Sequence, residues 1–467
     1  MDTVSGGRPA PPRTPGPAAG CLAVLCELLR SRNEFAGPAC AVLDDMAAHC
    51  REPLRVAVTG DVSCGKSTLV NALLGGRHAA VRWEETTAEV TWYRHPSLPP
   101  GLPPGPEHRM AVVPFPLADR IVLADTPGVN TASGRGRVTE DMLSAASDAA
   151  ASATVLLYLS GAELMGGSRE RLRRFVELTR GEYGSGFNIV LVAAKADTCT
   201  APWPSIEENL IAKSRIPGVR AVAVSQQLAM TVRAELLRPG HLATLRTLAG
   251  NSELAAAVPG GWHALELTAR RTGVAMDALA ALAEVAPLPC VTPALPLVAD
   301  GTIGTLRQLS GFWEELSGLR AVEAALESLA EDSEVLTVNA VTGRLHRLAA
   351  RLGAARADRI QRGLAQLRRC PHFVALDRRG AALHLRGPAL RSVPDGDRAA
   401  TAALLRGESD GPLPPSALAH WQRLAFQPGR STEVGRVARL VIEAASAPPP
   451  VQAHCSCAET LRKEPRG

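Results

Sequence analysis

Residues 54–76 read LRVAVTGDVSCGKSTLVNALLGG, and this stretch decides the fold of the chain. Residues 54–59 form a short, apolar, β-branched run, which is typical of a buried parallel strand. Residues 67–74 predict a helix, and the loop between them matches the phosphate-binding pattern G-x-x-x-x-G-K-S/T. A strand before this pattern and a helix after it are the context in which such a loop holds phosphate groups.

Each position of the loop has a predicted task. We expect the loop amides and the positive end of the following helix to face a β-phosphate. Lys66 then reaches the β- and γ-phosphates, and the Ser67 hydroxyl binds Mg²⁺. A purely structural turn would gain nothing from Lys followed by Ser-Thr. The predicted nucleotide-binding residues of this loop are Gly60, Asp61, Val62, Ser63, Cys64, Gly65, Lys66, Ser67 and Thr68.

Lysine is rare in this chain, which makes each lysine informative. The 51 basic residues include only Lys66, Lys195, Lys213 and Lys463 as lysines. A position that keeps Lys against this bias indicates a need for a compact ammonium group that a guanidinium cannot replace.

A second motif, Asp125-Thr126-Pro127-Gly128, closes the apolar run 121–124. An acidic residue at the carboxyl end of a strand beside a phosphate loop is where an outer-sphere Mg²⁺ ligand belongs, so we predict Asp125 in that metal-binding role. The backbone N–H of Gly128 is expected to meet the γ-phosphate. Alone, D-x-P-G is an ordinary turn, and its place after a phosphate loop gives it meaning.

A third motif, Ala194-Lys195-Ala196-Asp197, follows the apolar run 188–193. In guanine-specific sites this position has the pattern N/T-K-x-D. The carboxylate of Asp197 would accept from N1–H and N2–H₂ of guanine while the stem of Lys195 covers the base. Ala194 stands in place of Asn or Thr, which removes a hydrogen bond that normally steadies the site. The alternative is a solvated lysine at a strand end.

Two weaker candidates complete the predicted site. Thr86 and Thr87 lie between the first helix and the next strand, where a threonine senses the γ-phosphate through Mg²⁺. We choose Thr87 for this metal-binding and catalytic role. Ser225 follows the run 219–224, and its backbone N–H is expected to face the guanine oxygen.

The arrangement of apolar runs predicts the domain organisation. Further strands at 88–93, 121–124, 154–159, 188–193 and 219–224 alternate with helices such as 169–179. This alternation predicts an α/β phosphate-loop domain with a mainly parallel sheet and helices on both faces. Beyond residue 230, long helical periodicity, clearest at 306–329 and 335–355, predicts a helical bundle or stalk. The predicted units are a disordered leader (1–19), amphipathic helices (20–50), the α/β domain (51–232), the helical part (233–368) and a poorly defined region with a flexible tail (369–467).

Composition excludes several classes of protein. The net charge is +5 and the basic residues are scattered, so nucleic acid is not an expected partner. Ten cysteines at irregular spacing form no zinc-type repeat and are interpreted as reduced thiols. The first residues lack the pattern of a signal peptide, and no run of 18 apolar residues occurs. We therefore expect a cytoplasmic protein.

Together these motifs resemble the dynamin-like large GTPases, most closely the actinobacterial dynamin-family proteins that include the isoniazid-inducible ones of mycobacteria. The resemblance implies GTP hydrolysis to GDP and phosphate with Mg²⁺. It also implies homo- or hetero-oligomers with another dynamin-like protein and peripheral action on lipid at the inner face of the plasma membrane. The stretches that carry it are RVAVTGDVSCGKSTLVNALLGG (55–76), TTAEVTWYRHP (86–96), VLADTPGV (122–129), ATVLLYL (153–159), LVAAKAD (191–197) and VAVSQQLA (222–229).

One departure from this family affects catalysis. Animal dynamins carry a Gln before the phosphate-loop Ser that helps to position the attacking water, and Val62 occupies that place here. Ser63 matches the family Ser and is expected to help bind a stabilising cation. The predicted catalytic residues are Lys66, Ser63 and Thr87. Because Val62 cannot orient water, we expect either slow turnover or turnover that depends on another residue or a partner.

Two alternative functions remain open from the sequence. One is an Era-like or TrmE-like GTPase in RNA or ribosome maturation, although the second half has no KH-like GXXG region or basic stripe. The other is a scaffold that binds GTP but scarcely hydrolyses it, for which Val62 and Ala194 are the motivating residues.

Overall fold

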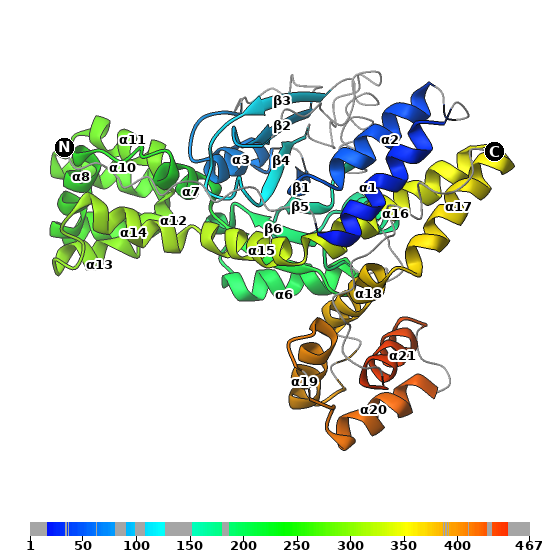
Figure 1. The fold of residues 1–467 in the computed structure, drawn as a ribbon. Helices are drawn as coiled ribbons and strands as arrows, with labels where there is room; N and C mark the ends of the chain where they lie inside the picture. Colours follow the sequence, from blue (N-terminus) through cyan, green and yellow to red (C-terminus); the bar gives the residue numbers. More distant parts are fainter. Residues whose placement is uncertain are drawn as a thin grey trace.

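A seven-stranded sheet forms the centre of the described part of the chain in the computed structural model (Figure 1). The strand order is β3-β2-β4-β1-β5-β6-β7, and every neighbouring pair is parallel except β2 with β4. The strands are β1 (Leu54–Gly60), β2 (Val90–Arg94), β3 (His108–Val112), β4 (Ile121–Asp125), β5 (Val155–Ser160), β6 (Ile189–Ala194) and β7 (Arg220–Val224). The structure describes residues 16–32, 35, 37–61, 63–79, 90–98, 108–126, 152–179, 186–385, 387, 390, 392–409, 411–426 and 432–446.

Helices cover both faces of this sheet, as the sequence predicts. Successive side chains of a strand point to opposite faces, so Val56 and Val58 join one buried cluster while Ala57 joins the other. The second cluster also contains Leu172 and Phe175 of α5. The mainly parallel α/β class is therefore confirmed. The first cluster includes residues of α3 (Lys66–Leu74) and α7 (Gln226–Arg233), and the second includes residues of α5 (Gly166–Thr179) and α6 (Trp203–Ser214).

Helices from both ends of the chain complete the first face of the sheet. Buried residues from before the sheet, such as Leu22 and Leu43, share one cluster with Leu326, Val341 and Leu364 from far behind it. The second half therefore returns to the sheet after leaving it. The elements involved are α1 (Pro17–Arg30), α2 (Pro38–His49), α15 (Leu319–Glu331), α16 (Ser333–Arg351), α17 (Ala354–Arg368) and α18 (Pro371–His384).

Residues 239–316 form a helical lobe with a hydrophobic cluster of its own, seen at the left of Figure 1. Arg233, at the end of α7, pairs with Glu314 at 3.0 Å and with Glu323 at 2.6 Å. This neck holds the point where the chain enters the lobe beside the point where it leaves. The lobe helices are α8 (Pro239–Gly250), α9 (Ser252–Ala257), η2 (Val258–Gly260), α10 (Gly261–Thr272), α11 (Met276–Val285), α12 (Leu288–Val291), α13 (Ala294–Ala299) and α14 (Leu306–Leu316).

The stretch that the sequence predicts as one helix, 306–329, is two helices joined at Gly318. Gly318 has φ 77°, and a Cβ there would lie 2.1 Å from the carbonyl oxygen of Ala223. The preceding carbonyl, of Ser317, accepts a hydrogen bond from the Ser225 N–H at 3.0 Å. The helix breaks because the chain touches β7 here, and only glycine tolerates that approach. Residues 233–368 thus contribute to two different cores rather than one.

The described part of 369–467 is helical, which the sequence did not predict. Helices α19 (Asp395–Arg406), α20 (Pro415–Phe426) and α21 (Thr432–Ser446) follow α18 at the bottom of Figure 1. Trp421 is fully buried among them, and its indole N–H donates to Thr401 Oγ1 at 2.9 Å. A separate hydrophobic cluster therefore supports this end of the chain.

A buried ionic cluster ties α2, β1 and α16 together. Asp45 binds Arg55 at 2.8 Å and Arg344 at 2.6 Å, and Arg55 also binds Glu52 at 2.9 Å. The side chain of Arg55 is only 1% exposed. Burial alone would raise the pKa of Asp45, but the two guanidinium groups outweigh it and hold that pKa below its usual value.

His49 lies in the same region and makes stability depend on pH. Burial, together with Arg55 and Arg344, lowers the pKa of His49 well below 6.5. The folded protein then binds fewer protons than the unfolded chain once the pH falls below 6.5. We expect the free energy of unfolding to decrease there, by up to about 1.4 kcal/mol per pH unit for this group. Urea unfolding of the wild type and of His49→Gln between pH 7 and pH 5 checks this; equal slopes would contradict it.

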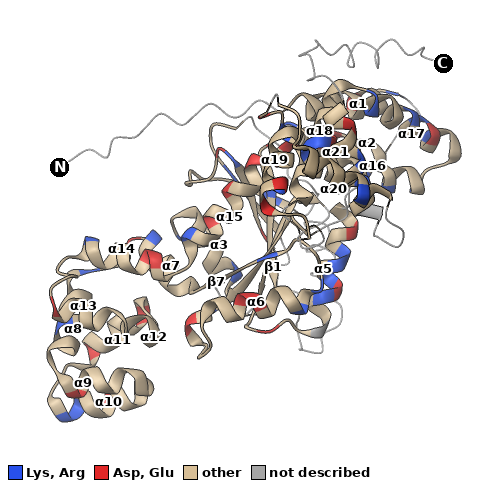
Figure 2. Cartoon of the chain, turned by 90° about the horizontal axis from the view of Figure 1, so that it is seen from below, with Lys and Arg blue, Asp and Glu red and all other residues tan. Residues whose placement is uncertain are grey.

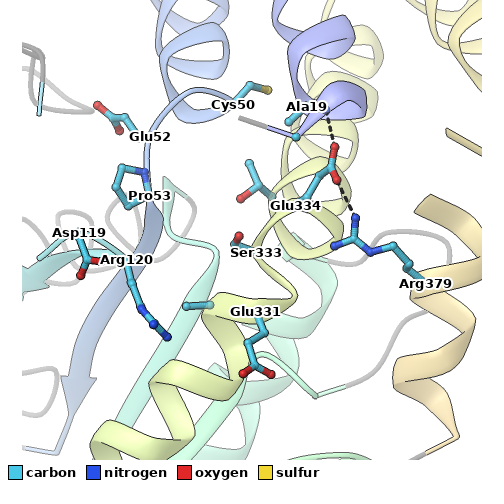
Figure 3. Close-up of a pocket in the computed structure, with 13 residues that line it drawn as sticks. Ala19, Cys50, Glu52, Pro53, Asp119, Arg120, Glu331, Ser333, Glu334 and Arg379 are labelled. Atoms are coloured by element: carbon cyan, nitrogen blue, oxygen red, sulfur yellow. Dashed lines mark hydrogen bonds and ion pairs between the residues drawn. The ribbon is translucent and has the colours of Figure 1, made fainter. Parts of the chain in front are cut away.

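A small cavity lies at the amino ends of β1 and β4, beside Pro53 and Arg120 (Figure 3). Glu334 in its wall accepts a hydrogen bond from the Ala18 N–H and pairs with Arg379, both at 2.8 Å. One carboxylate thus joins α1, α16 and α18. Ligands of parallel sheets bind at the opposite, carboxyl ends of the strands, so this cavity is not the candidate site.

Candidate nucleotide-binding site

The predicted site residues that the structure describes gather at the carboxyl edge of the sheet. Lys66 follows β1, Asp125 ends β4, Asp197 follows β6 and Ser225 follows β7. In the sheet β1 lies between β4 and β5, so the chain order switches direction there. A crevice at such a switch is where ligands of parallel sheets bind.

The loop from β1 to α3 is shaped by one close backbone contact. Gly60 has φ 148°, and a Cβ there would lie 2.1 Å from the carbonyl oxygen of Leu159. Only glycine lets the loop leave β1 this close to β5. The ammonium of Lys66, the first residue of α3, contacts the carbonyls of Gly60 at 3.4 Å and Asp61 at 2.9 Å. The cation therefore lies over the concave side of the loop.

Ser67 and Asp125 form the pair that the sequence predicts for a metal. The Ser67 hydroxyl donates to Asp125 Oδ2 at 2.9 Å, while the buried Oδ1 has no hydrogen-bond partner among the described residues. Burial raises the pKa of Asp125 to about 6, opposed by the Ser67 hydroxyl and by Lys66. A hydroxyl and one carboxylate, completed by phosphate oxygens, are the ligands that Mg²⁺ prefers. The residues present therefore fit this ion.

Asp61 is held by a polar cluster that the sequence motifs did not indicate. Its Oδ1 accepts from Arg171 at 3.0 Å and from Tyr158 and Ser168 at 3.2 Å each. Arg171 also donates to the Tyr158 hydroxyl at 2.7 Å. These contacts fix the phosphate loop to β5 and α5, and several basic residues lie along α5, where they are drawn in blue (Figure 2).

The base-binding motif forms a tight turn at the end of β6. Lys195 has the left-handed backbone angle φ 53°, and its carbonyl accepts from the Thr198 N–H at 2.9 Å and from the Thr198 hydroxyl at 2.8 Å. Asp197 is half-buried in the following turn, η1 (Ala196–Thr198). Burial, with the Asp197 carboxylate adding to it, raises the pKa of Cys290 to about 12, so α12 of the lobe lies beside this turn.

The other predicted residues do not all face the proposed nucleotide position. The Ser225 N–H is already bonded to Ser317, so in this conformation it does not face a base. Ser63 is exposed with φ 55°, and Thr68 is half-buried in the first turn of α3. Cys64 is buried and its thiol donates to the Asp61 carbonyl at 2.7 Å. The residues that lie outside the described part of the chain are Val62, Thr86, Thr87 and Gly128.

Besides the cluster around Asp61, two further polar residues near the site were missed from the sequence. Gln226, the first residue of α7, bonds both to the phosphate loop and to Lys195. Asn71 on α3 is fully buried, and its amide bonds the backbone of His78 and Ala79 at 2.6 to 2.9 Å. The sequence held one signal for Gln226: Ala194 has no polar side chain, so another group must steady the motif at residues 194–197.

Comparison with known families identifies the matching domain. Residues 55–192 match the family described as 50S ribosome-binding GTPase. The Isoniazid-induced protein IniC of Mycobacterium tuberculosis (strain ATCC 25618 / H37Rv) is 49% identical over 57 residues, which are 12% of each chain. The Probable transmembrane GTPase FZO-like, chloroplastic, of Arabidopsis thaliana is 31% identical over 111 residues, 22% of this chain and 12% of that protein. The chain thus matches only about an eighth of the length of each of these two relatives.

Among solved structures, one chain of an oligomerised bacterial dynamin pair, described as a mechanism for long-range sensing and tethering of membranes, resembles this chain distantly. The identity is 13%, the TM-score is 0.28, and the match covers 86% of this chain and 60% of the other. The assignment of the nucleotide-binding domain does not depend on this likeness.

Proposed function

We propose that this chain is a dynamin-like GTPase that binds GTP and GDP with Mg²⁺ at its phosphate loop and hydrolyses GTP to GDP and phosphate. The observation that carries the proposal is the meeting of Lys66, Ser67 and Asp125 at the carboxyl ends of β1 and β4. A cation, a hydroxyl and a carboxylate, one oxygen of which has no hydrogen-bond partner among the described residues, lie at the end of a strand-to-helix loop, where backbone amides favour an anion.

Each residue has a separate role in this proposal. The ammonium of Lys66 attracts the phosphate chain, and the positive end of α3 adds to that attraction. Ser67 and Asp125 hold Mg²⁺, which neutralises charge on the phosphates when it is bound. Asp197 accepts hydrogen bonds from the guanine edge, while Lys195 covers the base. Adenine offers an acceptor in place of N1–H, so the carboxylate discriminates against it.

Slow hydrolysis is part of the proposal. Val62 has no polar group to orient water, so Ser63 and Thr87 remain the proposed catalytic partners of Lys66. The proposed nucleotide contacts also include the Gly128 N–H. A scaffold that binds GTP and scarcely turns it over stays the second candidate, and Val62 is the observation that favours it.

Self-assembly and membrane action are proposed from the family resemblance alone. We propose a cytoplasmic protein that oligomerises with itself or with another dynamin-like chain and acts at a lipid surface. The boundaries near residues 232 and 368 are proposed to separate nucleotide-binding, stalk-like and C-terminal parts. In the described part of the chain, no helix has the length and apolar character needed to cross a bilayer.

Phosphate release from GTP by the purified full chain, with Mg²⁺ and with or without anionic phospholipid vesicles, tests the enzymatic proposal. Release that vesicles stimulate supports a GTPase acting on membranes. Binding of GTP with no release under either condition favours the scaffold. Failure of the wild type to bind any guanine nucleotide overturns the proposed function altogether.

Asp197→Asn is expected to shift preference from guanine to xanthine nucleotides. The amide can donate to the oxygen that xanthine carries at position 2, where a carboxylate only accepts. Because hydrogen bonds to charged groups contribute about 1.5 to 3 kcal/mol, a change of about tenfold or more in the ratio of GDP and XDP affinities is expected. Asp277→Asn, on an exposed position of α11, is the control. An unchanged ratio would place the base site elsewhere.

A further inference from the structure

Gln226 bridges the two loops on which the candidate site is built. Its Oε1 accepts from the Lys195 N–H at 2.8 Å, and its Nε2 donates to the Cys64 carbonyl at 3.0 Å. The residue is only 3% exposed, so water competes little for either bond. One amide thus spans from the phosphate loop to the turn that carries Asp197.

The contact to Lys195 completes the fixation of that residue. The carbonyl of Lys195 is held by Thr198, and its N–H is held by Gln226. A non-glycine residue with φ 53° adopts a conformation that needs such support. Asp197 lies two residues further on, so the direction of its carboxylate depends on this support.

In the pattern N/T-K-x-D the first residue normally supplies a hydrogen bond, a tether that steadies the base-recognition turn, and Ala194 at that position cannot supply it. Ala194 is 4% exposed at the end of β6, and its methyl group lies in the hydrophobic cluster on the first face of the sheet. The methyl group neither donates nor accepts a hydrogen bond. Gln226 approaches the same turn from a different strand-to-helix junction.

The helix that carries Gln226 is itself anchored. The residue before it, Ser225, is fully buried with its N–H bonded to the Ser317 carbonyl at 3.0 Å. Further along α7, the Thr231 hydroxyl donates to the Val285 carbonyl at 2.6 Å. The amide of Gln226 therefore projects from a fixed position, as a positioning group requires.

We propose that Gln226 is the positioning residue that couples the phosphate loop to the base-recognition turn, and that it thereby determines discrimination for guanine. The role rests on the proposed nucleotide-binding function. Gln226 acts through Lys195 and Cys64 and is assigned no contact with the nucleotide itself. It replaces the tether that Ala194 lacks.

The test is Gln226→Met, which keeps the length of the side chain and removes both hydrogen bonds. Affinities for fluorescent GDP and IDP are measured on the full chain, because IDP lacks the 2-amino group that Asp197 would bind. We expect wild type to prefer GDP by about tenfold or more. In the variant we expect GDP affinity to fall about tenfold and the preference to shrink to about threefold or less.

Gln227→Met is the matched control. Gln227 is the same residue type one position further along α7, and its amide donates to the Ala283 and Glu284 carbonyls of the lobe at 3.1 Å each. The control variant also loses two hydrogen bonds, but neither of these bonds contacts the phosphate loop or the turn that carries Asp197. We expect the GDP-to-IDP ratio of this control to equal that of the wild type.

The midpoint of thermal unfolding of each protein, measured without nucleotide, shows whether a substitution destabilises the fold, whereas the ratio of GDP and IDP affinities reports the positioning role. If Gln226→Met does not fold, Gln226→Asn takes its place, since a side chain one methylene shorter cannot hold both contacts. A narrowed ratio in either variant, with the Gln227→Met ratio unchanged, supports the proposal. An unchanged ratio, or equal weakening of GDP and IDP, overturns it. Failure of wild type to bind GDP instead overturns the proposed function on which it rests.

Discussion

Lys66→Ala is expected to weaken GDP binding by at least about 100-fold, which corresponds to about 2.7 kcal/mol. Lys66 is buried with its ammonium against the Gly60 and Asp61 carbonyls, and we propose it as the chief cation for the phosphate chain. Removing it leaves the loop amides and the helix dipole as the main attraction, and these are weaker than a charge-assisted bond. Titration of fluorescent GDP into the variant measures the loss.

Lys213→Ala provides the control for this experiment. Lys213 also pairs with oxygen, contacting Glu163 at 3.0 Å, but it lies on the exposed face of α6 away from the loop. We expect its GDP affinity to equal that of the wild type. Wild-type affinity in Lys66→Ala would refute the assignment of the phosphate loop.

The second large effect is expected at Asp45, where Asp45→Ala should destabilise the fold by about 3 to 5 kcal/mol. Asp45 neutralises both Arg55 on β1 and Arg344 on α16. The side chain of Arg344 is 11% exposed, so its charge would lose its carboxylate without gaining full hydration. Breaking a buried pair is costly because the remaining charge stays buried.

The neighbouring residue Asp44 supplies the comparison. Asp44 lies on α2 beside Asp45 and pairs with Arg30 of α1 at 3.0 Å. The side chains of Asp44 and Arg30 are about half exposed, at 52% and 54%. We expect Asp44→Ala to cost less than about 1 kcal/mol. Urea unfolding followed by circular dichroism measures both variants. Similar losses at the two positions would contradict the importance of the buried cluster.

Local sequence patterns predicted six of the seven described strands, missing β3, and predicted that Ser67 and Asp125 lie together. The strand, loop and helix around Lys66 follow from apolar runs and a motif, and parallel strands bring their carboxyl ends to one edge. The Ser67–Asp125 contact at 2.9 Å agrees with that reasoning. Each of these features depends on residues close together in the sequence or on a general property of parallel sheets.

Long-range packing could not be predicted in the same way. Helical periodicity shows that a segment has an apolar face but does not tell which surface that face meets. It therefore did not reveal that α15 and α16 return to the sheet or that the chain breaks at Gly318. The bridge made by Gln226 depends on three segments that are far apart in sequence, and only the folded chain brings them together.

The neck formed by Arg233, Glu314 and Glu323 has an evolutionary consequence. Because the chain leaves the sheet and returns to it at adjacent points, the lobe between them is an insertion, and its α12 also contacts the turn that carries Asp197. Insertions of this kind are tolerated where the two ends are adjacent. We therefore expect the lobe helices that lie away from that turn to tolerate changes in length while the seven-stranded sheet keeps its strand order.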